Sequence, residues 1–169
     1  MGELLTRGTV WLALTLYVAG EIARRRLASS VAARWLNTLG CAAFIAHVAC
    51  AFNFYHVWSH AVAYADTARQ TAEMVGWSSG AGLYVNYFFA AVWLVDAFWS
   101  WITPSYTARP VWAIWAVRAF FWFMIFNGAV VFARGPMRGY GLFLSLALIA
   151  SWWPRQRTSI DRPSCRLSI

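Results

Sequence analysis

Long apolar runs, separated by short polar or basic stretches, form the pattern of the whole chain. An apolar run of about 20 residues is long enough to cross a bilayer, since a helix rises ~1.5 Å per residue. The pattern predicts five membrane-spanning helices, over residues 4–23, 35–55, 81–102, 111–133 and 138–153. The fifth run is short, so it either includes the glycine-rich residues before it or lies partly in the interface.

The longest stretch without a helix-breaking residue follows the start of the second run. Neither proline nor glycine occurs between Cys41 and Met74. A further helix is therefore predicted over 56–75 and is ended by Gly76. Polar residues form one stripe along it and alanines another. The helix either extends the second span outward or kinks and lies on the membrane surface.

The amino-acid composition indicates that these predicted helices belong to a membrane protein. Hydrophobic residues make up 61% of the 169-residue chain and charged residues 12%, against roughly 45–50% apolar in a soluble domain. Many of the 12 tryptophans lie near the ends of apolar runs, as interfacial belts do. We expect an all-α integral membrane helical bundle in one domain, 1–154, followed by a basic, disordered cytoplasmic tail, 155–169.

The charge pattern orients the predicted bundle. All 14 basic residues are arginine, which excludes lysine Schiff-base chemistry and, with the abundant alanine, indicates a GC-rich and bacterial genome. Five spans with the N-terminus outside give nine inner arginines (24, 25, 26, 34, 109, 155, 157, 162, 166) against four outer ones (7, 69, 134, 138). This agrees with the positive-inside rule and predicts the bacterial inner membrane. The arginines flank apolar segments and do not form one face, so no nucleic-acid partner is expected.

Charged residues inside predicted spans are costly and need a reason. Asp96 and Arg118 lie at equal distances from the middle of the 103–110 connection, so an antiparallel hairpin places them level. We predict an ion pair between them, either as a clamp between helices or as part of a proton or substrate pathway. Glu21 lies one turn before Arg25, and a local pair is predicted there.

A second set of polar residues is predicted to converge at the outer ends of the spans. In a continuous helix, the spacing of Asn53, His56 and His60 places them on one face. His47 would then lie on the opposite face, as a separate mid-membrane polar point. The predicted outer pocket consists of Asn53, His56, His60, Tyr84, Asn86, Tyr87 and Asn127.

Several kinds of chemistry fit the histidines. His56 and His60, four residues apart on a helix, would suit a metal ion, or they would simply form hydrogen bonds at the interface. Bis-histidine haem requires facing helices, whereas all three histidines lie in one stretch. The string Gly76-Trp-Ser78-Ser-Gly80 matches that of serine hydrolases, but it follows a helix where those enzymes have a strand. No cofactor is therefore predicted, with a metal at His56 and His60 as the open alternative.

Three functions follow from these features. The first is a binding or accessory subunit that packs against membrane lipid or other membrane subunits and carries the outer polar pocket. The second is an outer-leaflet membrane enzyme that uses His56 and His60 through a metal or as acid–base groups. The third, a small transporter with Asp96 and Arg118 in its pathway, is the least favoured, because the chain shows no internal repeat.

Overall fold

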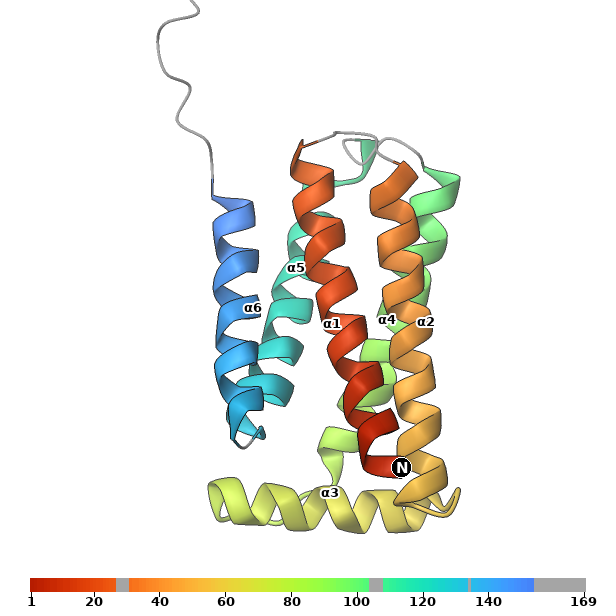
Figure 1. Ribbon diagram of the computed structural model, residues 1–169, viewed down its shortest axis with the longest axis vertical. Coiled ribbons are helices and arrows are strands. Elements are labelled where there is room, and N and C mark those ends of the chain that lie inside the picture. Colours follow the sequence, from red (N-terminus) through yellow and green to blue (C-terminus); the bar gives the residue numbers. More distant parts are fainter. Residues whose placement is uncertain (27–30, 104–107, 134, 154–169) are drawn as a thin grey trace, which may run out of the picture.

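The chain folds into a bundle of upright helices with one helix lying across an end (Figure 1). The computed structural model describes residues 1–26, 31–103, 108–133 and 135–153. The upright elements are α1 (Gly2–Arg26), α2 (Val31–Phe54), α4 (Ala81–Ile102), α5 (Val111–Phe126) with its continuation η2 (Asn127–Val131), and α6 (Pro136–Trp152). The crossing helix is α3 (His60–Val75). The predicted all-α class is confirmed, whereas the predicted tail 155–169 lies outside the described residues.

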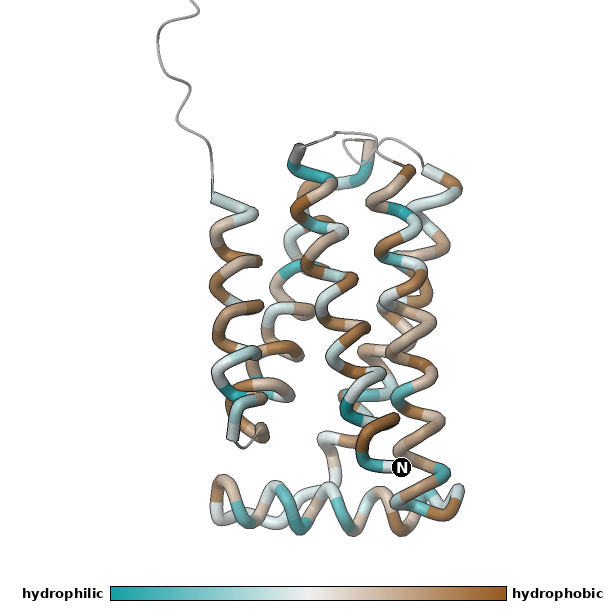
Figure 2. Tube along the Cα trace, viewed as in Figure 1, coloured by the Kyte–Doolittle hydropathy of each residue, from teal (hydrophilic) through white to brown (hydrophobic). Residues whose placement is uncertain are grey.

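Three elements are long and apolar enough to cross a membrane by length and composition. They are α2, α4 and the continuous stretch Val111–Val131 of α5 and η2. Large apolar side chains such as Val95, Phe98 and Phe143 are exposed on the sides of the bundle. Figure 2 shows hydrophobic residues along all the upright helices. Such contiguous exposed apolar surface is typical of a membrane-associated protein.

An aromatic core holds four of the upright helices together. Tyr17 of α1 stacks on Phe121 of α5 with ring centroids 4.5 Å apart. Phe89 of α4 lies between Phe121, at 4.8 Å, and Phe44 of α2, at 4.9 Å. Trp93 of α4 is fully buried among these rings. Each aromatic pair contributes about 0.5–1.5 kcal/mol beyond its buried area.

Glycine permits the closest helix contact. A Cβ atom at Gly141 of α6 would clash with the backbone carbonyl of Ala129 in η2. Small residues at such points let helix backbones approach each other in membranes. Gly141 therefore fixes how closely α6 approaches η2.

Of the two predicted continuations of the second span, the straight outward extension is wrong and the kink into a separate helix is found. Helix α2 ends at Phe54, and Val57 and Trp58 follow with φ values of 47° and 55°. Ser59 then caps α3, its hydroxyl oxygen accepting a hydrogen bond from the Val62 amide. The chain turns there, so α3 lies across the bundle and packs chiefly on α4 (Figure 1). As predicted, α3 ends before Gly76, which has φ 77°. We call this end of the bundle the α3 end and the opposite end the arginine end.

Candidate functional site

Asp96 of α4 is the first of two buried carboxylates at the arginine end. It is 3% exposed and accepts hydrogen bonds from Arg109, at 2.6 Å, and from the Asn37 amide, at 2.9 Å. A guanidinium nitrogen of Arg24 lies 3.8 Å away. Asn37 in turn accepts a hydrogen bond of 3.1 Å from the indole of Trp93. Asp96 thus ties α1, α2 and Arg109, two residues before α5, to α4.

Glu21 of α1 is the second carboxylate and is 2% exposed. It accepts hydrogen bonds from Arg24 at 2.8 Å, from Arg118 at 2.9 Å and from the indole of Trp152 at 3.1 Å. The rings of Trp115 and Trp152 lie 5.5 and 5.7 Å from the Arg118 guanidinium. Because Arg24 contacts both carboxylates, Glu21 and Asp96 belong to one network.

The salt bridges at this end differ from the predicted ones. We predicted that Asp96 pairs with Arg118, whereas Asp96 forms its salt bridge with Arg109 and Arg118 forms one with Glu21. Matching levels along a hairpin fixes the height of a side chain but not the direction in which it points around its helix. The carboxylate that Arg118 faces is Glu21 of α1, a helix outside the predicted hairpin.

The local pair predicted for Glu21 and Arg25 is also corrected. Glu21 pairs with Arg24 instead. The Arg25 guanidinium donates to the backbone carbonyls of Ala150 and, at 2.6 Å, of Trp153. These carbonyls end α6, where the helix dipole favours a cation. The network of Glu21 and Asp96, together with the contact of Arg25 with α6, connects α1, α2, α4, α5 and α6 at the arginine end.

A cavity of about 390 Å³ lies between α2, α3 and α4 at the α3 end. We call it the histidine cavity. Its walls are apolar and aromatic, with a few polar groups supplied by all three helices. Its lining residues are Phe44, His47, Val48, Ala51, Phe52, Tyr55, His56, Asp66, Thr67, Gln70, Leu83, Asn86 and Tyr87.

Two histidines line this cavity in different hydrogen-bonding states. Nδ1 of His47 lies 2.8 Å from the carbonyl oxygen of Thr6 in α1. A carbonyl only accepts, so Nδ1 carries a proton, and Nε2 is an acceptor whenever the ring is neutral. Nδ1 of His56 is buried and has no hydrogen-bond partner among the described residues. A buried unsatisfied nitrogen costs about 1–3 kcal/mol, so the His56 ring gains from a ligand or water that bonds to it.

The carboxylate of the histidine cavity is balanced locally. Asp66 of α3 forms a salt bridge with Arg69. Its other oxygen accepts a hydrogen bond of 3.1 Å from the Gln70 side chain. The cavity therefore carries a neutralised carboxylate, the side-chain amides of Gln70 and Asn86, and two imidazoles.

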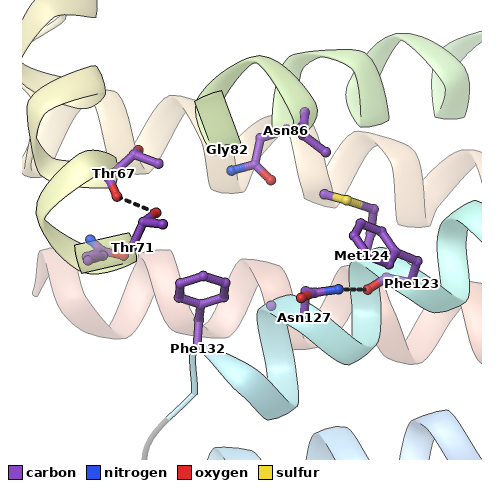
Figure 3. Close-up of a pocket in the computed structure, with 11 residues that line it drawn as sticks. Thr67, Thr71, Gly82, Asn86, Phe123, Met124, Asn127 and Phe132 are labelled. Carbon is purple, nitrogen blue, oxygen red and sulfur yellow. Dashed lines mark hydrogen bonds between the residues drawn. The ribbon is translucent and has the colours of Figure 1, made fainter. Parts of the chain in front are cut away.

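A second cavity, of about 320 Å³, adjoins the first between α3, α4, α5 and η2 (Figure 3). We call it the amide cavity, because the side chains of Gln70, Asn86 and Asn127 line it and no described lining residue is charged. The hydroxyls of Thr67 and Thr71 donate to backbone carbonyls at 2.8 and 2.9 Å, so their oxygens remain acceptors. Its other lining residues are Gly82, Val85, Phe123, Met124, Gly128 and Phe132.

The backbone of η2 shapes one wall of the amide cavity. The amide of Phe132 donates to the carbonyl of Asn127, five residues earlier, at 2.9 Å. This is the hydrogen bond of a π-helix, which often occurs at functional sites. The Asn127 side-chain amide donates to the carbonyl of Phe123 at 2.9 Å. This bond fixes the Asn127 side chain and leaves its oxygen as an acceptor.

The residues of the predicted outer pocket are divided among three places. His56, Asn86 and Tyr87 line the histidine cavity, and Asn86 and Asn127 line the amide cavity. The other three predicted residues, Asn53, His60 and Tyr84, are not among the lining residues of either cavity.

His60 and Asn53 instead have partners near the turn into α3. The ring nitrogens of His60 lie 3.1 Å from the Tyr87 hydroxyl and 3.4 Å from the Tyr84 hydroxyl, which fastens the start of α3 to α4. Asn53 is exposed and accepts a hydrogen bond of 3.3 Å from the Trp58 indole.

The predicted metal pair is not formed as a chelate on one helix, because the chain leaves α2 before His56 and enters α3 at His60. Both nitrogens of His60 face tyrosine hydroxyls. Among the described residues, no group of three or more histidine, cysteine, aspartate or glutamate side chains is arranged to hold a metal ion.

The predicted outer pocket did not include the polar lining residues His47, Tyr55, Asp66, Thr67 and Gln70 of the histidine cavity. His47 was placed on the surface opposite His56, which holds only for an unbroken helix. The polar stripe of α3 was the available signal for Asp66 and Gln70. That stripe shows which residues share a face but not that the face meets the bundle.

The chain was compared with models of known protein families, with curated proteins and with solved structures, and none of them matches it. Its function must therefore be argued from its own cavities.

Proposed function

We propose that this protein is an integral membrane protein that binds a small amphipathic molecule at its α3 end. The histidine cavity is the observation that carries the proposal. Ligand pockets typically measure about 300–1,000 Å³ and combine apolar walls with a few convergent polar groups. The histidine cavity has both properties, and its neighbour adds the side-chain amide of Asn127.

The membrane setting determines where the ligand comes from. The proposed topology has five spans with the α3 end outside, which is supported by nine inner arginines against four outer ones. The proposed location is the bacterial inner membrane, and the proposed partner is membrane lipid. A molecule from the outer leaflet would then reach both cavities without leaving the interface.

Mass spectrometry of molecules that copurify with the full chain tests the binding function. Gln70→Leu and Asn86→Leu remove amides that line both cavities, whereas Asn53→Leu removes an amide that lines neither. We expect a molecule bound in stoichiometric amount to the unaltered protein and to Asn53→Leu, and depleted from the other two. Equal amounts in all four proteins, or no bound molecule, would refute the function.

A second function, acid–base chemistry on the bound molecule, is favoured by His47. The Thr6 carbonyl holds the His47 ring in one tautomer, which leaves Nε2 as a base at the cavity wall. Under this function, the molecule recovered from His47→Gln would be the unconverted form of the one recovered from the unaltered protein. Recovery of the same molecule from both proteins would leave binding alone.

A further inference from the structure

We infer that the bound molecule is a neutral single-chain lipid whose chain leaves the amide cavity past Gly128 and Phe132 and lies between α1 and α6. This inference rests on the proposed binding function and adds the class of ligand and its direction. It is carried by a third cavity, by the residues that the cavities share, and by the charge of their walls.

The third cavity, of about 530 Å³, lies between α1, η2 and α6, and we call it the α1–α6 cleft. Leu4 and Trp11 of α1 and Met137 of α6 give it apolar walls. Among its described lining residues only Arg7 is charged; it is largely exposed and forms a salt bridge of 2.8 Å with Glu3. The remaining lining residues are Gly8, Gly128, Phe132, Ala133 and Pro136.

Shared lining residues place the three cavities in a row. Thr67, Gln70 and Asn86 line both the histidine cavity and the amide cavity. Gly128 and Phe132 line both the amide cavity and the α1–α6 cleft. Along the row, the polar lining changes from imidazoles and a carboxylate to amides and then to mainly apolar side chains. This gradient matches a polar head followed by a hydrocarbon chain.

Gly128 lies where the amide cavity meets the cleft. A Cβ atom built on Gly128 meets no described atom within 4 Å beyond its chain neighbours and its own helix backbone. The junction is therefore open on this side, and a larger side chain at position 128 would enter it without clashing with the backbone. Phe132 is the large side chain of the junction and points into the amide cavity in Figure 3.

The charges of the walls favour a neutral head. The carboxylate of the histidine cavity is already paired with Arg69, and the amide cavity has no charged lining residue among those described. A charged head would have to lose its hydration without gaining an opposite charge, which is costly. A neutral head with hydroxyl or carbonyl groups finds both donors and acceptors there.

Photolabelling of the full chain in nanodiscs with monoacylglycerol probes tests the inference. One probe carries a diazirine at the end of an 18-carbon chain, and the other carries it beside the glycerol of an 8-carbon chain. We expect unlabelled monoacylglycerol to suppress labelling by the long probe at residues 4–11 and 135–137. It should likewise suppress labelling by the short probe at residues 67–71 and 82–86.

Gly128→Leu and Gly139→Leu form the matched pair of variants, since a Cβ on Gly139 also has no atom within 4 Å. Gly128→Leu should lose the suppressible labelling by the long probe, while its elution profile and thermal unfolding in detergent match those of the unaltered protein, which shows that it is folded. Gly139→Leu should keep the suppressible labelling by both probes. Suppressible labelling of the cleft that persists in Gly128→Leu, or is absent from the unaltered protein, overturns the inference. Loss of suppressible labelling by the short probe in the unaltered protein would count against the proposed binding function as well.

Discussion

Replacing Asn37 by leucine tests whether the buried network at the arginine end stabilises the bundle. Asn37 is 1% exposed. Its amide donates to Asp96 at 2.9 Å and its oxygen accepts from Trp93 at 3.1 Å. Leucine is close to asparagine in size, so the substitution removes both hydrogen bonds without opening a large cavity.

The expected loss follows from the two bonds. The Trp93 indole is left buried without this acceptor, which costs about 1–3 kcal/mol, and a hydrogen bond to a charged group contributes about 1.5–3 kcal/mol. Hydrogen bonds inside membrane proteins average nearer ~0.6 kcal/mol, because the unfolded chain also finds partners in the membrane. We therefore expect Asn37→Leu to lower the free energy of unfolding by about 2–4 kcal/mol.

Unfolding in mixed detergent micelles of increasing SDS fraction measures this loss. Asn53→Leu is the matched control, being the same substitution at the exposed end of the same helix, and should change stability by less than about 0.5 kcal/mol. In a double-mutant cycle, Trp93→Phe should cost less in the Asn37→Leu background, since the donor is then already unpaired. Equal effects of Asn37→Leu and Asn53→Leu, or an additive cycle, would refute the reasoning.

Three further predictions concern packing, charge and the attachment of α3. Gly141→Ala should lower the free energy of unfolding by about 1–3 kcal/mol through its clash with a backbone carbonyl of η2, whereas Gly139→Ala should not; equal stability would contradict the close approach. Glu21→Leu should cost about 3–5 kcal/mol, because it leaves buried donors behind, and Glu21→Leu with Arg118→Leu should cost less than the two separately; an additive result would exclude the coupling. His60→Phe should speed hydrogen exchange in α3 with little change in global stability, and unchanged exchange would show that the tyrosine contacts do not hold α3.

The turn before α3 is the feature of the fold whose position the sequence did not predict. Apolar length predicted the upright helices, and Gly76 correctly marked the end of α3. The stretch before His60 contains neither glycine nor proline, yet Val57 and Trp58 adopt positive φ values. Bulky and β-branched residues seldom do so, hence these two residues gave no sign of the turn. Ser59, the residue that caps α3, was the one available sign of a helix start.

The same turn limited the prediction of the site. The amides and His56 were recognised as candidates from their positions near the span ends. His47 was assigned to another surface, and the inward face of α3 was not anticipated. Both errors followed from extending α2 as a straight rod, since a residue nine positions along such a rod points the opposite way.

The sequence by itself determined that this protein is a set of apolar helices whose outer surface suits lipid, because length and hydrophobicity are properties of each segment alone. It also indicated that Asp96 and Arg118, as charged residues inside predicted spans, need partners. Only the tertiary structure decided which polar groups meet. Side-chain partners depend on how each helix is rotated and on where α3 returns across the bundle. Those two features pair Asp96 with Arg109 and place the histidine and amide cavities side by side.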